Sequence, residues 1–329
     1  MGSIGVLGGR GFIGRRLAGL LQDGGHDVRT VDVVAATGNG RQRLGDVRDC
    51  QGLTAALDGT EIVYNLAAVH RDDVRPVSLY QQVNVAGAAN VCGACRELGI
   101  DRLIFTSSAA VYGSVEPYSC EGTAPKPSTA YGRSKLEAER IYRAWQAEAP
   151  ARRCLVIVRP TVVFGEGNRG NVYQLLHQIM ARRFVMVGDG RNRKSMAYVG
   201  NVSAFLMHVL GLGAGTHLFN YADGPDLSMG ELVQIVLTML GRSSVIRARI
   251  PYPMGYLGGV ACDALAAVTG RRFPISAVRI RKFCSTTTFS TDRMRGIGFL
   301  PPIGLREALE RTIRHELSQR ESAAAGAAG

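Results

Sequence analysis

A run of glycines near the start of the chain lies between a short apolar segment and a segment with helical periodicity. Residues 3–7 suit a short buried strand, glycines follow at Gly8, Gly11 and Gly14, and residues 15–21 repeat apolar side chains at helical spacing. Glycines at such a turn permit its tight geometry, let the backbone approach a pyrophosphate and allow close helix–strand packing. The helix N-terminus that follows favours an anion. The spacing therefore predicts a dinucleotide-binding turn.

The next predicted strand supports this interpretation and suggests which dinucleotide is bound. Residues 27–31 end at Asp32, about 20 residues beyond the glycines. A carboxylate at this place accepts hydrogen bonds from the 2′-hydroxyl of the adenosine ribose and repels a 2′-phosphate. We therefore expect NAD rather than NADP.

Predicted strands and helices alternate through the first half of the chain, which is typical of a doubly wound parallel sheet. In such α/β sheets, ligands bind beyond the carboxyl ends of the strands. Several polar or small residues are expected at these ends: Asp32, Asp46, Ala67, Ala68 and Ser108. We predict a Rossmann-type domain over residues 1–160. A smaller α/β lobe over residues 161–322 binds substrate and returns some segments to the first sheet, and residues 323–329 form a disordered tail.

Tyr131 and Lys135 are four residues apart in a segment predicted to be helical, so they share one face of the helix. An ammonium near a phenol favours the phenolate. Such a pair can exchange a proton with a substrate hydroxyl at neutral pH. Chance also produces this spacing on amphipathic helices, and the glycine turn and Ser108 are what raise its significance.

Composition limits the remaining possibilities. The net charge is +12, but the arginines are scattered without a long basic run, which favours an anionic small molecule over nucleic acid. Seven cysteines form no paired framework, and Cys92 and Cys95 lie within a predicted helix without a neighbouring histidine. They indicate buried thiols in a reducing cytoplasm, with no metal site. The apolar segment 254–269 contains glycines and Asp263, so we expect a packed helix and no stable membrane insertion.

Taken together, these motifs resemble those of the extended short-chain dehydrogenase/reductases, specifically the NAD-dependent epimerase/dehydratase group that acts on nucleotide sugars. The resemblance covers nearly the whole chain. It rests on the glycine turn, Asp32, Gly45-Asp46-Val47-Arg48-Asp49, Asn65-Leu66-Ala67-Ala68, Ser107-Ser108-Ala109-Ala110-Val111-Tyr112-Gly113, Tyr131-x-x-x-Lys135 and Arg159-Pro160.

The resemblance implies a role for each matching residue. Ser108 would hydrogen-bond the reacting sugar oxygen, Tyr131 would be the acid/base, and Lys135 would bind the nicotinamide ribose and lower the tyrosine pKa. The positions that would hold NAD are Gly8, Gly11, Phe12, Ile13, Gly14, Asp32, Asp46, Val47, Leu66, Ala67, Ala68, Tyr131, Lys135 and Pro160. The positions that would hold the substrate are Ser108, Asn171, Val172, Arg193 and Lys194, with Arg193 or Lys194 as the phosphate cation.

Two departures from the family pattern narrow the reaction. Ala109 and Ala110 stand where the 4,6-dehydratases carry Asp-Glu, so dehydration is not expected. Residues 161–163 hold Thr-Val-Val where many 4-epimerases place an asparagine, a version also similar to 4-ketoreductases.

The leading hypothesis is an NAD-dependent nucleotide-sugar 4-epimerase that works through a 4-keto intermediate. The alternatives are an NAD(P)H-dependent 4-ketoreductase and, as a minor one, a non-enzymatic dinucleotide sensor. By analogy with similar proteins, the helices at about 78–98 and 131–149 would pair in a homodimer.

Overall fold

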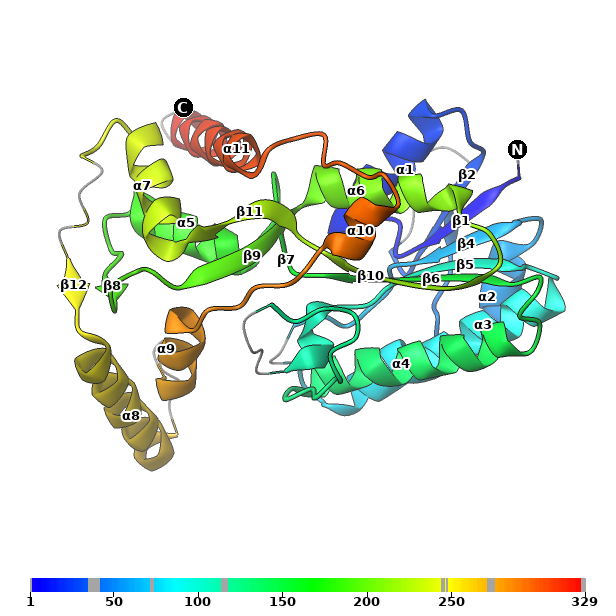
Figure 1. The fold of residues 1–329 in the computed structure, drawn as a ribbon, viewed down its shortest axis with the longest axis horizontal. Helices are drawn as coiled ribbons and strands as arrows, with labels where there is room; N and C mark the ends of the chain where they lie inside the picture. The colour runs from blue at the N-terminus through cyan, green and yellow to red at the C-terminus, as the bar shows by residue number, and fades with distance from the viewer. Residues whose placement is uncertain are drawn as a thin grey trace.

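The computed structural model describes residues 2–34, 42–71, 74–113, 118–243, 246, 248–270 and 276–326. Two lobes make up the described part of the chain, with one large sheet in the first lobe and smaller sheets in the second (Figure 1).

The large sheet has seven strands in the order β10-β6-β5-β4-β1-β2-β3, and every neighbouring pair is parallel. Its strands are β1 (Ile4–Leu7), β2 (Val28–Asp32), β3 (Gln42–Leu44), β4 (Ile62–Asn65), β5 (Arg102–Thr106), β6 (Cys154–Pro160) and β10 (Gly215–Tyr221). Most are short, apolar and buried, as expected for a parallel sheet that helices cover on both faces. The predicted α/β fold with a doubly wound parallel sheet is confirmed.

Helices pack on both faces of this sheet (Figure 1). One face is covered by α1 (Phe12–Asp23) and α6 (Val199–His208), and the other by α2 (Cys50–Leu57), α3 (Gly87–Glu97) and α4 (Ala130–Ala147). The first core includes Leu17 and Phe205, and the second includes Leu53 and Trp145. The sequence predicted one helix over about 78–98. The structure is helical over this segment, and its first part is a π-helix, η1 (Tyr80–Ala86), that leads into α3.

The second lobe is built around a three-stranded sheet in the order β11-β9-β7 and a two-stranded sheet of β12 and β8. These strands are β7 (Val162–Phe164), β8 (Met186–Val187), β9 (Arg193–Tyr198), β11 (Asp223–Ser228) and β12 (Arg249–Ile250). The helices are α5 (Asn171–Met180), α7 (Met229–Met239), α8 (Tyr252–Thr269), α9 (Ala277–Cys284) and α11 (Leu305–Gly326). The short helix α10 (Asp292–Gly296) instead packs on the first lobe, where Met294 joins the core of α6 and the large sheet. The predicted capping box is present, because Ser228 and Glu231 exchange side-chain and backbone hydrogen bonds at the start of α7.

Two predictions for the second half are wrong. Segment 254–269 is helical, but of the residues of α8 only Gly259 is buried, so the helix is largely exposed. An apolar run alone does not reveal whether a neighbour covers it. The predicted disordered tail begins at Ala323, yet α11 continues to Gly326, consistent with the high helix propensity of alanine. Residues 327–329 lie outside the described residues.

The expectation of buried thiols holds for only part of the set. All seven cysteines are free; Cys92, Cys95 and Cys154 are buried, whereas Cys50 and Cys120 are exposed. Burial raises the pKa of Cys92 to about 12. Among the described residues, no group of histidine, cysteine and acidic side chains has the arrangement of a metal site. In the same part of the chain, no helix is both long and apolar enough to cross a bilayer.

Candidate active site

The residues predicted to bind the cofactor and to catalyse the reaction lie along the carboxyl edge of the seven-stranded sheet. Strand β1 lies between β2 and β4, so the turn after β1 has Asp32 at the end of one neighbour and the residues after Asn65 at the end of the other. Strands β5 and β6 follow in the sheet and end at Thr106 and Pro160. Parallel strands therefore bring together segments that are far apart in the sequence.

The glycine turn is too tight for larger residues. Gly8 has φ +73°, and a Cβ atom there would lie 2.8 Å from the Ala67 nitrogen. A Cβ atom on Gly14 would lie 2.2 Å from the Gly8 carbonyl oxygen. Gly11 is the residue before α1, so Phe12, Ile13 and Gly14 form the first turn of that helix, where backbone N–H groups lack helical partners. This turn has the shape and polarity of a cradle for a pyrophosphate.

Asp32 is tied to the same turn. One of its carboxylate oxygens accepts a hydrogen bond from the backbone N–H of Arg10 at 3.0 Å, and the other accepts one from Val34 at 3.2 Å. The carboxylate is half-buried and retains lone pairs for ribose hydroxyls.

The segment after β4 approaches the glycine turn from the other side. Asn65 fixes its path, because the Asn65 side-chain oxygen accepts a hydrogen bond from the Ala67 N–H at 3.0 Å and its amide nitrogen donates one to Tyr142 at 2.6 Å. Leu66, Ala67 and Ala68 are each partly exposed. Small side chains here leave room for a flat ligand beside the sheet edge.

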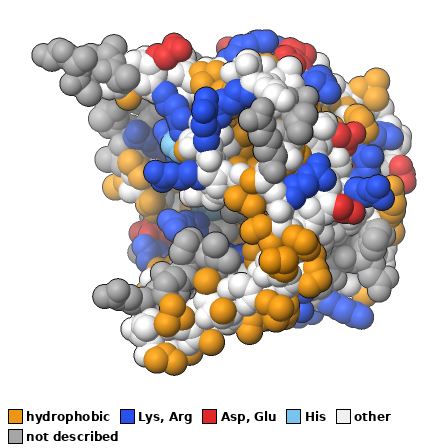
Figure 2. Space-filling model, turned by 90° about the vertical axis from the view of Figure 1, so that its left-hand side faces the viewer, with side chains coloured by type: hydrophobic (Ala, Val, Ile, Leu, Met, Phe, Trp, Pro, Cys, Tyr) orange, Lys and Arg blue, Asp and Glu red, His pale blue; other side chains and the backbone are white. Residues whose placement is uncertain are grey.

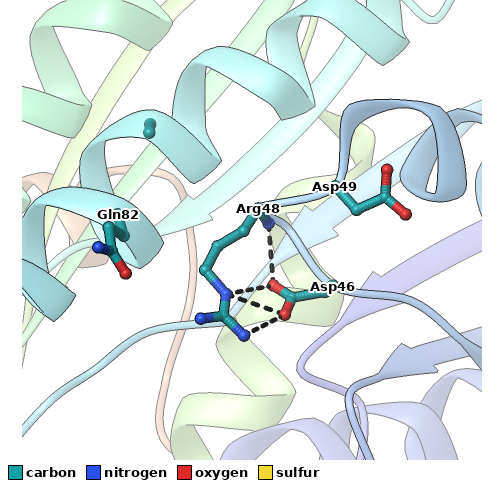
Figure 3. Close-up of a pocket in the computed structure, with 5 residues that line it drawn as sticks. Asp46, Arg48, Asp49 and Gln82 are labelled. Atoms are coloured by element: carbon teal, nitrogen blue, oxygen red, sulfur yellow. Dashed lines mark hydrogen bonds and ion pairs between the residues drawn. The ribbon is translucent and has the colours of Figure 1, made fainter.

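Asp46 and Val47 lie further along the same edge. Asp46 lines an open pocket with Arg48, Asp49 and Gln82, the last of which comes from η1 (Figure 3). The Arg48 side chain and backbone N–H bind the Asp46 carboxylate, with the shortest contact at 2.5 Å, and this hydrogen bonding lowers the pKa of Asp46. Val47, next in the sequence, is buried. The Asp46 carboxylate in this pocket is therefore held in one position by Arg48 and favours its ionised form.

Ser108 and Tyr131 come from separate elements that touch. Ser108 precedes a short 3₁₀ helix, η2 (Ala109–Tyr112), and its hydroxyl accepts a hydrogen bond from the Ala110 N–H at 3.1 Å. Tyr131 lies in the first turn of α4, where the Thr129 hydroxyl caps the helix by accepting a bond from Gly132 N–H at 3.0 Å. A Cβ atom on Gly132 would lie 2.5 Å from the Ala110 carbonyl oxygen, so the two elements are in close contact.

Lys135 lies one turn after Tyr131 and is 2% exposed. Its ammonium is 4.3 Å from the centre of the Phe105 ring, over which it makes a cation–π contact. Burial lowers the pKa of Lys135 to about 7, against the opposing effect of the nearby Glu139 carboxylate. Ribose hydroxyls or a phenolate near this buried ammonium would stabilise its charge.

Below this pair lies a buried network that the sequence analysis missed. The Arg159 guanidinium binds the Glu139 carboxylate through two nitrogens at 2.9 and 2.6 Å, and Ser107 donates to the same carboxylate at 2.5 Å. Arg159 also donates to the Tyr112 hydroxyl at 2.8 Å. The network joins the residue after β5 to β6, η2 and α4. One signal was available, because Glu139 follows Lys135 by four residues and so shares its face of the helix.

Asn84 is a second residue that the sequence analysis missed. It is buried in η1, and its side chain exchanges hydrogen bonds with the backbone of Val69 at 2.9 and 3.0 Å. Its amide also donates to the Ser134 hydroxyl at 2.8 Å, between Tyr131 and Lys135 in the sequence. Asn84 thus fixes α4 relative to the segment after β4, and π-helical turns often occur at functional sites.

The predicted substrate residues lie in the second lobe and are less uniform. Asn171 is exposed at the first position of α5, whereas the Val172 side chain is packed in the core of the lobe. Arg193 is exposed and donates to the Asp226 carbonyl at 2.5 Å. Lys194 donates to the Lys282 carbonyl and to two hydroxyls, and burial lowers its pKa to about 8. Their roles toward a substrate remain predictions.

This chain is similar to known proteins over both of its lobes. The model of the NAD dependent epimerase/dehydratase family matches residues 4–221. The N-acetyl-alpha-D-glucosaminyl-diphospho-ditrans,octacis-undecaprenol 4-epimerase of Escherichia coli O157:H7 is 47% identical over 275 residues, which cover 83% of each chain. A 2-alkyl-3-oxoalkanoate reductase of Stenotrophomonas maltophilia (strain K279a) is 29% identical over 328 residues, which cover 93% of this chain and 97% of the reductase. Among solved structures, MoeE5 in complex with UDP-glucuronic acid and NAD aligns with a TM-score of 0.75 at 25% identity, over 97% of this chain and 100% of that chain.

Proposed function

This chain is a member of the NAD-dependent epimerase/dehydratase family, and we propose that it is a 4-epimerase, which inverts carbon 4 of a hexose carried on a diphosphate. The expectation of an enzyme of this family with NAD as cofactor is confirmed by the family match and the related proteins. The observation that carries the proposal is the placement of Tyr131 and the buried Lys135 on one face of α4, against the turn that bears Ser108.

The residues of the sheet edge fit NAD. The glycine turn leaves no space for a Cβ atom at Gly14 and presents the first turn of α1, which suits the pyrophosphate. Asp32 would hold the adenosine ribose, and Asp46, which lines the pocket, would border the adenine together with Val47. Lys135 would hold the nicotinamide ribose, whose hydroxyls can accept hydrogen bonds from its buried ammonium. When bound, NAD supplies a group that accepts a hydride from a carbon atom and gives it back.

The chain itself supplies the proton transfers. Tyr131 as phenolate takes the proton of the C4 hydroxyl when that carbon is oxidised to a ketone, and returns it when the ketone is reduced on its other face. The charged form of Lys135 favours the phenolate, and the Ser108 hydroxyl orients the reacting oxygen. The neighbours of Ser108 have no proton to offer, because Ala109 and Ala110 carry methyl groups only. Carbonyl–alcohol exchange without dehydration therefore matches the site.

The second lobe would bind the diphosphate. Arg193 is the better candidate for the cation that binds the phosphates, because its guanidinium is exposed. The Lys194 ammonium already donates hydrogen bonds to the Lys282 carbonyl and the Thr287 hydroxyl. Asn171 would bind the diphosphate from the first position of α5. Val172 would bind it only through its backbone, because its side chain is in the core of the lobe. For the group beyond the diphosphate, the name of the Escherichia coli relative favours a polyprenol over a nucleoside. We therefore propose N-acetylglucosaminyl-diphospho-undecaprenol as the first substrate to test.

We further propose that the enzyme is a homodimer. In the described structure, α4 and the stretch formed by η1 and α3 are neighbours on one face of the large sheet, as a paired helical interface requires. The mass of the protein in solution, measured by light scattering, tests this proposal directly.

The function is tested by assaying the protein as purified, without added nicotinamide cofactor. We expect it to convert the lipid-linked sugar to its C4 epimer, and to release nicotinamide nucleotide when denatured. UDP-N-acetylglucosamine assayed in parallel distinguishes the two diphosphate carriers. Strict dependence on added NADH or NADPH, with net oxidation of the cofactor, would instead identify a 4-ketoreductase and refute the epimerase proposal.

A further inference from the structure

The helix α8 presents an exposed apolar stripe. Met254, Leu257, Leu265 and Val268 are 64%, 66%, 49% and 86% exposed, and Ala261 completes the series at helical spacing. At 1.5 Å per residue, the stripe from the first to the last of these residues is about 21 Å long. Figure 1 shows α8 at the bottom of the second lobe, away from the large sheet. In Figure 2, which is turned about the vertical axis, hydrophobic side chains gather at the bottom of the molecule.

The opposite side of α8 is held by α9, which fixes the direction of the stripe. The two helices touch at Gly259, where a Cβ atom would lie 2.7 Å from the backbone nitrogen of Ala277. Asp263 is the only charged residue of α8, and its carboxylate accepts a hydrogen bond from the Ala277 N–H at 3.0 Å. The one acid is thus engaged at the α9 side, and the stripe itself carries no charge.

Positive charge lies on α9, on the other side of α8 from the stripe. Arg279, Arg281 and Lys282 are exposed on α9. The whole segment 249–284 contains six arginines or lysines and the single acid Asp263. At a membrane interface, apolar side chains of a helix enter the acyl region, and an excess of nearby cations is attracted to anionic headgroups.

From this arrangement we propose that the α8–α9 pair docks the enzyme on the surface of an anionic lipid bilayer. A second copy of the chain is a poorer occupant, because it would cover the apolar stripe and leave the excess positive charge of the segment without opposite charge. A bilayer with acidic headgroups complements both the apolar stripe and the cations. The helix would lie on the membrane and not across it.

The docking pair is linked to the part of the second lobe that is proposed to bind the diphosphate. The Lys194 ammonium donates to the Lys282 carbonyl at 2.8 Å, and the Asn192 amide donates to the Phe283 carbonyl at 2.8 Å. Docking through α8 would therefore hold strand β9 near the membrane surface. If the substrate is lipid-linked, which rests on the proposed function, its polyprenol chain can stay in the bilayer while its sugar enters the site.

Co-sedimentation with lipid vesicles tests the proposal. The full-length protein is mixed with vesicles of phosphatidylglycerol and phosphatidylethanolamine, and separately with vesicles of phosphatidylcholine alone. We expect binding to the anionic vesicles that weakens with added salt. The double variant Leu257→Glu/Leu265→Glu should lose at least about tenfold in binding, since it places acids in the stripe. The matched control is Leu300→Glu, because Leu300 is 77% exposed and lies outside the α8–α9 pair.

The outcomes separate docking from catalysis. Equal binding by the double variant and the wild type, or no binding by the wild type, would overturn the docking proposal. A double variant that changes the oligomeric state, with no vesicle binding by the wild type, would assign the stripe to a second copy and would also overturn it. Epimerisation in detergent solution should be the same in the double variant and the wild type. Vesicle binding by a protein without epimerase activity would support docking and refute only the proposed function.

Discussion

Replacing Lys135 with methionine should change how the stability of the protein depends on pH. Burial lowers the pKa of the Lys135 ammonium from 10.5 to about 7 in the folded protein without nucleotide. The unfolded chain therefore binds more protons than the folded chain between these two values, so folding becomes more favourable as pH rises through this window. A methionine has no proton to bind and similar length, so the variant lacks this contribution.

The size of the effect follows from the shift. One pKa unit corresponds to about 1.36 kcal/mol, and at pH ~7 the shift disfavours the folded state by about 4 kcal/mol. Raising the pH to ~9 removes about half of this penalty, so wild-type stability should increase by about 2 kcal/mol more than that of Lys135→Met. At pH ~7 the variant should be the more stable of the two, and it should be unable to perform efficient catalysis.

Urea unfolding of nucleotide-free protein at the two pH values measures this difference. Trp145 is the only tryptophan and is fully buried in α4, so its fluorescence reports unfolding of the element that carries Lys135. Lys126→Met is the matched control, because Lys126 is exposed, and it should follow the wild type. Parallel pH dependence in wild type and Lys135→Met would show that burial does not perturb this lysine.

Three further substitutions test the site. Gly14→Ala should abolish nicotinamide retention, because the new Cβ atom would clash with the Gly8 carbonyl oxygen. The control is Gly19→Ala in the same helix, where a Cβ atom has open space. This control should retain the nucleotide and gain up to about 1 kcal/mol in unfolding free energy. Tyr131→Phe should lower kcat by about 10²–10⁴-fold with nicotinamide still bound, since only the proton transfer is lost; unchanged kcat would remove Tyr131 from the mechanism. Glu139→Gln should lower the unfolding free energy by about 3–5 kcal/mol, because it leaves the buried Arg159 charge without its carboxylate; a loss well below this range would mean that the pair is not buried as described.

The sequence was most informative where backbone chemistry restricts residue type. Glycines at a strand–helix turn, an acid at the end of the second strand and a tyrosine–lysine pair at helical spacing each have a local physical cause, so the fold and the sheet edge could be predicted. The contacts of Glu139 with Arg159 and of Asn84 with Ser134 could not, because they join segments that only the tertiary fold brings together.

Exposure was predicted less well than secondary structure. The apolar pattern of 254–269 is equally compatible with a packed helix and an exposed one, and the difference depends on which elements lie nearby. The substrate lobe shows the same limit. Val172 and Arg193 were both predicted to bind substrate, and the sequence did not show that the Val172 side chain is in the core of the lobe while the Arg193 side chain is exposed.

The central claim is that oxidation and reduction occur at the same sugar carbon within one enzyme–substrate complex. It is tested most directly with N-acetylglucosaminyl-diphospho-undecaprenol that carries deuterium at C4. Mass spectrometry of the C4 epimer should find the deuterium retained, with no nicotinamide cofactor added. Loss of the deuterium from the sugar, or product formation only when reduced cofactor is supplied, would contradict the account.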